Sequence, residues 1–157
     1  MSIWLFLVHW LHIIGAAVWF GGTVIGYFVL FPGLLTRPVP EARATFLSIQ
    51  KFMAPVMGTA AQLVVWLGII RATWFGPIDS WADVTGTPYG HAFLGAIVLT
   101  VAFAVYGATT SRKFEARVWD GDTIRPTARA FVRNGGITSV LILGAVIALM
   151  VRMRFGL

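Results

Sequence analysis

Hydrophobic residues are gathered into four long runs along the chain, and most of the charged residues lie between these runs. The runs cover residues of about 3–32, 53–75, 88–110 and 136–151. A helix that crosses a bilayer needs roughly 20 consecutive apolar residues, because it rises about 1.5 Å per residue across a hydrocarbon core of about 30 Å. We therefore predict an all-α fold, an integral membrane four-helix bundle that forms one domain over residues 1–157.

Local signals indicate where these helices begin and end. The first run stops at Pro32 and the second at Pro77, and each proline stands beside a glycine, a pairing typical of turns. Thr87 and Pro88 suit the N-cap and the first position of the third helix. The first run has no basic leading segment and no small-residue cleavage site, so we interpret it as a membrane helix and not as a signal peptide.

Composition supports this interpretation. Of the 157 residues, 58% are hydrophobic and 11% are charged, whereas a soluble domain has about 45–50% and about 25%. These values exclude an ordinary soluble domain and a disordered chain. The chain has no cysteine, which excludes disulfides, Fe–S clusters, thiolate-ligated haem and cysteine zinc sites.

The 12 Lys and Arg residues are divided unequally between the two predicted sides of the membrane. Those in the connections 33–52 and 111–135 are Arg37, Arg43, Lys51, Arg112, Lys113, Arg117, Arg125, Arg129 and Arg133. The other side has Arg71, Arg152 and Arg154. The positive-inside rule therefore predicts a multi-pass protein of the inner (plasma) membrane with both termini outside. We expect its basic residues to meet the lipid bilayer and not nucleic acid.

The polar residues within the apolar runs are the candidates for chemistry. The runs contain no Asp or Glu, which argues against a carboxylate proton relay or ion pathway. His9, His12 and His91 all fall in the predicted outer half of the membrane. On the first helix, one stripe at helical spacing holds His12, Gly15, Ala16, Trp19, Gly22, Thr23 and Gly26. On the third helix, the matching stripe holds His91, Gly95, Val98, Ala102 and Thr109.

A histidine followed by small residues suits a flat ligand that lies against the helix. Neutral imidazole binds haem iron, copper and zinc, and two histidines on separate helices of a bundle are enough for a b-type haem. We therefore predict His12 and His91 as axial ligands of haem b, with Gly15, Trp19 and Gly95 beside the cofactor.

Two alternatives stay open from the sequence. Depth along the helices pairs His91 better with His9 than with His12, although the helix face favours His12. The small residues could also serve helix packing alone, since Gly22 and Gly26 form a G-x-x-x-G motif.

Arg71 is the candidate partner for the two haem propionates. It lies about four residues inside the outer end of the second run, and arginine pairs strongly with carboxylates. Arg152 and Arg154 are expected to extend to lipid phosphates. The alternative for Arg71 is an ion pair with Asp79 or Asp83 on the outer loop.

Several segments resemble a known family. Residues 12–22, HIIGAAVWFGG, resemble the first helix of HemJ-type membrane protoporphyrinogen oxidases, and CopD-like copper-resistance membrane domains carry a similar helix. Residues 51–58, KFMAPVMG, resemble the entry to the second helix of the HemJ family, and residues 91–95, HAFLG, the opening of its third. Residues 133–134, Arg-Asn, are similar in residue type to the segment before the fourth helix of that family.

The HemJ-type resemblance implies haem b, and it places His12 at the position of an essential histidine. The family also has a functionally important lysine shortly after the histidine that corresponds to His91, and this chain has Phe93 there. The resemblance therefore favours haem binding and electron transfer over porphyrinogen oxidation itself, and it leaves enzymatic activity open.

The CopD-like resemblance implies copper binding or transport without an enzymatic activity. Imidazoles and thioethers suit Cu(I), and the candidates near the outer side are His9, His12, His91, Met1, Met150 and Met153. A third interpretation is a structural or assembly subunit without a cofactor. The sequence leaves open a quinone, a porphyrin or a redox protein as partner, and a homodimer.

Overall fold

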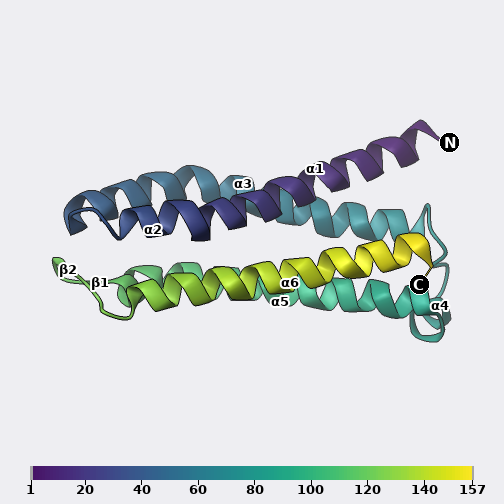
Figure 1. Cartoon of the computed structure of the whole chain (residues 1–157). Helices are drawn as coiled ribbons and strands as arrows, with labels where there is room; N and C mark the ends of the chain where they lie inside the picture. The colour runs from purple at the N-terminus through teal and green to yellow at the C-terminus, as the bar shows by residue number, and fades with distance from the viewer. Residues whose placement is uncertain (1, 157) are drawn as a thin grey trace.

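The structure is a computed structural model that describes residues 2–156, and it is almost wholly helical (Figure 1). Its elements are α1 (Ile3–Ile25), the π-helical turn η1 (Gly26–Leu30), α2 (Phe31–Leu34), α3 (Val39–Thr73), α4 (Trp81–Gly86), α5 (Pro88–Val118), β1 (Trp119–Asp120), β2 (Thr123–Ile124) and α6 (Ala128–Phe155). Four helical segments, 3–34, 39–73, 88–118 and 128–155, are long and apolar enough to cross a membrane. The expectation of an all-α, multi-pass membrane protein is confirmed at this level.

The long helices run alongside one another in two pairs (Figure 1). α1 packs mainly against α3, and α5 packs mainly against α6. Both ends of the chain lie near α4, at what we call the α4 end; β1 and β2 lie at the opposite, hairpin end. The first turns of α1 diverge from both α3 and α6 at the α4 end (Figure 1).

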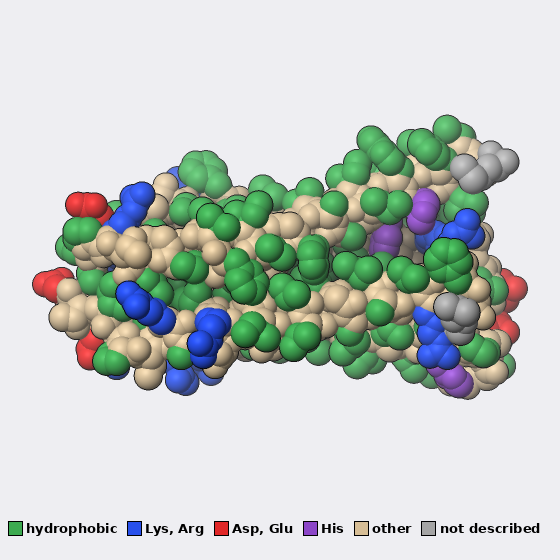
Figure 2. Space-filling view, viewed as in Figure 1, with side chains coloured by type: hydrophobic (Ala, Val, Ile, Leu, Met, Phe, Trp, Pro, Cys, Tyr) green, Lys and Arg blue, Asp and Glu red, His purple; other side chains and the backbone are tan. Residues whose placement is uncertain are grey.

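The helices are longer than the apolar runs that predict them. The second was expected over about 53–75 and spans Val39–Thr73, and the fourth was expected over about 136–151 and spans Ala128–Phe155. At about 1.5 Å per residue, such helices exceed a hydrocarbon core of about 30 Å. Their ends carry the charged residues, which gather at both ends of the bundle and leave the middle of the visible face without charge (Figure 2).

The first helix does not stop at Pro32, as its sequence suggested. Proline lacks an amide hydrogen and its ring crowds the carbonyl four residues earlier. The wider turn of η1 precedes it, and the Phe31 N–H donates to the Gly26 carbonyl. This turn lets the helix continue to Leu34 before the chain reverses into α3.

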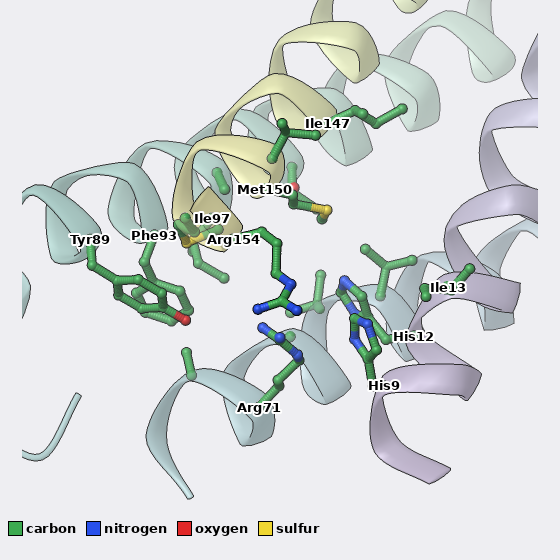
Figure 3. A pocket seen from close by; sticks show the side chains of 18 of the residues that line it. His9, His12, Ile13, Arg71, Tyr89, Phe93, Ile97, Ile147, Met150 and Arg154 are labelled. Carbon is green, nitrogen blue, oxygen red and sulfur yellow. The ribbon is translucent and has the colours of Figure 1, made fainter. Parts of the chain in front are cut away.

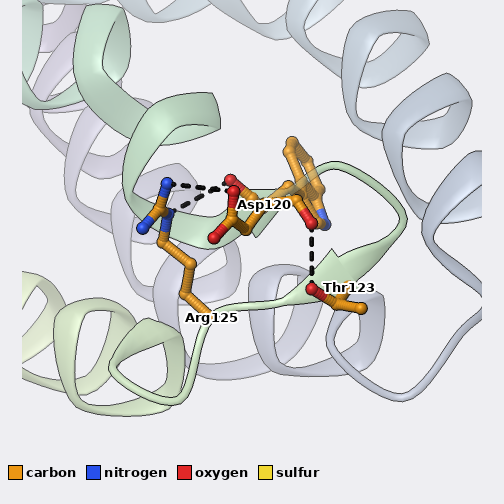
Figure 4. A network of polar contacts seen from close by, with 4 residues as sticks. Asp120, Thr123 and Arg125 are labelled. Atoms are coloured by element: carbon orange, nitrogen blue, oxygen red, sulfur yellow. Dashed lines mark hydrogen bonds and ion pairs between the residues drawn. The ribbon is translucent and has the colours of Figure 1, made fainter.

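Aromatic rings join the helices at the hairpin end. Phe46 of α3 stacks on Phe114 of α5, with 4.5 Å between the ring centroids, and the edge of Trp119 packs on both rings. The turn beyond Trp119 is closed by polar contacts (Figure 4): Arg125 pairs with Asp120 at 3.4 Å, and the Thr123 hydroxyl donates to the Asp120 carbonyl.

Two N-caps stabilise the connection at the α4 end. Thr87 caps α5 as predicted, and its hydroxyl accepts from the Gly90 N–H. The short α4 was not predicted; it begins with a capping box in which the Ser80 hydroxyl accepts from the Asp83 N–H and the Asp83 carboxylate accepts from the Ser80 N–H at 2.8 Å. Hydrogen bonds from Ser80 and from the Asp79 N–H hold the pKa of Asp83 below its ordinary value.

This capping box makes the stability of the α4 end depend on pH. Because the pKa of Asp83 is lower in the folded protein, its contribution is present above the ordinary aspartate value of about 3.9 and is lost as the pH falls through the folded value. We expect Asp83→Asn to lower the melting temperature slightly at pH 7, and the difference from wild type to shrink in acid. Thermal unfolding of both proteins at several pH values measures this, and a difference that is equal at every pH would contradict the carboxylate's role.

Candidate functional site

A cavity of about 280 Å³ lies at the α4 end, and all four long helices line it (Figure 3). Most of its walls are apolar. Its polar or sulfur-bearing side chains are His9, His12, Arg71, Tyr89, Thr100, Met150, Met153 and Arg154. The surface is hollowed beside the diverging start of α1, and histidine side chains show within the hollow (Figure 2). The cavity is therefore open on the side of the bundle, where a membrane would place lipid.

His12 is the most buried titratable group of the cavity. Only 8% of the residue is exposed, and its Nδ1 has no hydrogen-bond partner among residues 2–156. Gly68 of α3 makes room for the ring, since a Cβ at this glycine would lie 3.1 Å from His12 Cε1. A buried nitrogen without a partner costs about 1–3 kcal/mol, so a ligand that satisfies it would stabilise this arrangement.

Two arginines converge on the same space. The guanidinium groups of Arg71 and Arg154 point toward one another and toward the imidazoles of His9 and His12 (Figure 3). Arg71 is half-buried, and its Nε has no partner within the described chain. No described Asp or Glu lines the cavity. Cationic groups held together in an apolar membrane region favour an anionic ligand.

The sequence left open an ion pair for Arg71 and lipid contact for Arg154, and the structure shows where both side chains lie. Within residues 2–156 no ion pair joins Arg71 to Asp79 or Asp83, and the Asp83 carboxylate is engaged with Ser80. Arg154, which was expected to extend to lipid phosphates, is exposed and also lines the cavity. It does so because the last turns of α6 lie across the cavity from α1.

The structure does not bring His91 to His12, which corrects the predicted pairing. His91 is exposed, and its Nε2 lies 2.6 Å from the Thr85 carbonyl oxygen. Its neighbours Tyr89 and Phe93 line the cavity in its place. The buried face of α5 holds Gly90, Ala92, Ala96, Thr100, Phe103, Phe114 and Val118. Of the predicted stripe, Gly95 is half-buried and the other members are exposed, with Val98 58% exposed.

Gly15, Trp19 and Gly95, the residues predicted beside a cofactor, make contacts between helices. The stripe on α1 is buried as expected, but a Cβ at Gly15 would lie 3.2 Å from Leu63 Cβ on α3. Trp19 packs on Phe103, with 5.2 Å between the ring centroids. A Cβ at Gly95 would lie 3.3 Å from Leu149 Cδ1 on α6. None of Gly15, Trp19 and Gly95 lines the cavity.

Some cavity residues were missed at the level of sequence. Gly68 could have been predicted from sequence, because it precedes Arg71 by three residues and therefore lies on the same face of the helix. Phe93 also lies in the cavity wall. Of the three methionines that the sequence named as candidate copper ligands, Met150 and Met153 line the cavity, and Met1 lies outside the described residues.

The donor set limits what the cavity could hold. In the described chain, no group of three or more His, Cys, Asp or Glu side chains is placed to bind a metal ion. A metal at His12 therefore needs donors of another kind, such as thioethers or a macrocycle. Comparison of the chain with protein-family models, with curated proteins and with solved structures found no match.

Proposed function

We propose that this chain is a multi-pass protein of the plasma membrane that binds haem b in the α4-end cavity, with His12 as the protein's ligand to the iron. The observation that carries the proposal is the buried His12 imidazole, with its unpartnered Nδ1, facing an apolar cavity that also holds two arginines. Haem brings four nitrogen donors of its own, so one histidine suffices. Bound haem would supply one-electron redox chemistry, and the resemblance to HemJ-type proteins supports the same cofactor.

The remaining cavity residues fit the other parts of this cofactor. Arg71 and Arg154 offer guanidinium groups to the two propionates. Phe93 and Met150 provide apolar walls. The cavity volume is close to the lower limit of about 300 Å³ for ligand pockets, so the lateral opening would have to accommodate part of the macrocycle.

The placement of the histidines predicts the coordination of the iron. His9 precedes His12 by three residues on the same face of α1, so the two rings approach the cavity from the same side. They cannot bind opposite faces of one haem. With His91 outside the cavity, we expect the protein to offer one histidine ligand to the iron, His12.

An absorption spectrum of the detergent-solubilised protein tests the proposal directly. The expected result is a Soret band in the protein as purified, or after titration with haem. A protein that stays colourless and does not bind added haem would overturn the proposal.

Copper binding is a second candidate, favoured by one specific observation. The thioethers of Met150 and Met153 line the same cavity as the imidazoles of His9 and His12, and this donor set suits Cu(I). An absorption spectrum and a metal analysis distinguish the two functions, because a copper protein of this kind would be colourless and would retain copper in proportion to protein.

The arginines provide a further test of the haem proposal. We expect Arg71→Gln and Arg154→Gln each to weaken haem retention about 10- to 100-fold, the equivalent of one charge-assisted hydrogen bond. Each should also lower the reduction potential, because a nearby positive charge favours ferrous over ferric haem. Redox titration and haem transfer to a competing protein measure the two effects. Arg152→Gln is the matched control, since Arg152 is at the same end but does not line the cavity; equal effects in all three would contradict a role for the cavity.

A further inference from the structure

A second cavity, of about 370 Å³, lies at the hairpin end, between the end of the first helical segment and the start of α6. Its lining residues are Tyr27, Phe28, Pro32, Leu35, Thr36, Arg129, Val132 and Arg133. It shares no residue with the α4-end cavity. A role for this second cavity is therefore independent of the proposed function.

Charge at this cavity is entirely positive. Arg129 and Arg133 are four residues apart on α6, so their side chains lie on one face, one turn apart. Both are exposed, and no described acidic residue lines the cavity. Arginine binds phosphate groups with two parallel hydrogen bonds, so this pair is suited to a phosphate.

Close contact between helices shapes the cavity. A Cβ at Gly135 would lie 2.7 Å from Tyr27 Cε1, and a Cβ at Gly136 would lie 3.0 Å from Phe28 Cζ. These glycines let α6 approach η1 more closely than other residues would. The cavity walls formed by Tyr27 and Phe28 are thus held in place by the packing of the backbone.

Beyond the cavity, the same face of α6 becomes apolar toward the middle of the bundle. Ile137 and Leu141 follow Arg133 at successive intervals of four residues, and they are 46% and 68% exposed. Phe28, on the opposite wall, is 47% exposed. A cationic pair at the helix end that continues into an exposed apolar stripe matches the headgroup and acyl chain of a phospholipid.

We propose that the hairpin-end cavity is a binding site for one anionic phospholipid. Arg129 and Arg133 bind its headgroup phosphate, and an acyl chain lies along Ile137 and Leu141. The position fits the bilayer, because the arginines lie in the first turns of α6, at the hairpin end, and α6 runs from there toward the middle of the bundle, whose visible face carries no charge (Figures 1 and 2). Basic pockets between membrane helices bind anionic headgroups in this manner.

The test uses the full chain purified in mild detergent. We expect it to retain phosphatidylglycerol, counted by mass spectrometry of the extracted lipid, and to melt at a higher temperature when phosphatidylglycerol is added but not when phosphatidylcholine is added. The double variant Arg129→Gln/Arg133→Gln should lose at least tenfold in apparent affinity for phosphatidylglycerol.

The matched control is Lys113→Gln/Arg117→Gln on α5. This pair removes the same charge from exposed positions four residues apart at the hairpin end, and neither residue lines the cavity. The control should bind phosphatidylglycerol as the wild type does. Equal loss in the two double variants would mean diffuse attraction to anionic lipid and would overturn the proposal.

Two further outcomes are decisive. Thr36→Trp keeps both arginines but fills the cavity, and we expect it to lose lipid binding while its helical content stays unchanged; full retention of binding would overturn the cavity as the site. Inorganic phosphate should neither stabilise the protein nor displace the lipid. Stabilisation by phosphate alone, equal to that by phosphatidylglycerol, would assign the arginines to a free anion instead.

Discussion

The His12→Ala variant is expected to lose almost all of its haem, whereas His91→Ala should keep the wild-type spectrum. His12 is buried at the cavity beside Gly68. If haem binds as proposed, removing this side chain would leave the iron without its histidine ligand. His91 lies outside the cavity beside the Thr85 carbonyl. The ratio of Soret absorbance to protein absorbance, measured on variants purified side by side, gives the result.

His91→Ala is a well-matched control, because it removes the same side chain at the same end of the bundle. His9→Ala should weaken haem binding less than His12→Ala, since His9 is exposed and His12 is buried. If His91→Ala lost haem as completely as His12→Ala, the bis-histidine pairing predicted from sequence would be right and the cavity assignment wrong. If only His9→Ala lost haem, His9 would be the ligand.

The largest effect on stability is expected for Gly90→Ala. Gly90 is where the first turn of α5 crosses α4, and a Cβ there would overlap the Asp83 carbonyl oxygen and lie 2.5 Å from the Val84 carbonyl oxygen. Backbone atoms cannot move aside as a flexible side chain can. We therefore expect a loss of about 1–3 kcal/mol, the usual range for overpacking, seen as a lower melting temperature in detergent.

Gly86→Ala is the control for this substitution. Gly86 lies only four residues away, yet a Cβ there would meet no atom within 4 Å. Alanine also favours helix more than glycine does. The Gly86→Ala protein should melt at or slightly above the wild-type temperature, and equal destabilisation by the two substitutions would show that the crossing of α4 and α5 is not the cause.

The sequence predicted the four membrane helices because hydropathy is a property of local composition. It did not predict where the helices end. α3 begins at Val39 and not near Met53 because a helix can continue past the hydrocarbon core with polar residues on it. It predicted the Thr87 cap of α5 because that contact joins residues three apart in the chain, Thr87 and Gly90.

The two helices that carry histidines, α1 and α5, show why the sequence predicted one buried face correctly and not the other. On α1 the small and polar residues fall on one stripe, so the sequence by itself determined which face is buried and that His12 belongs to it. On α5 every face is apolar, so periodicity could not choose among them, and His91 was assigned to the wrong one. Only the packing of α5 against α6 and α4 decided that Phe93 and not His91 faces the cavity.

The cationic character of the cavity was likewise decided in three dimensions. The sequence by itself indicated that Arg71 lies about four residues inside the outer end of the second apolar run, and it left Asp79 and Asp83 open as partners. Only the tertiary structure brings Gly68 beneath His12 and Arg154 opposite Arg71, because these residues come from three different helices. Contacts between helices depend on how the bundle closes, and no spacing within a single helix encodes them.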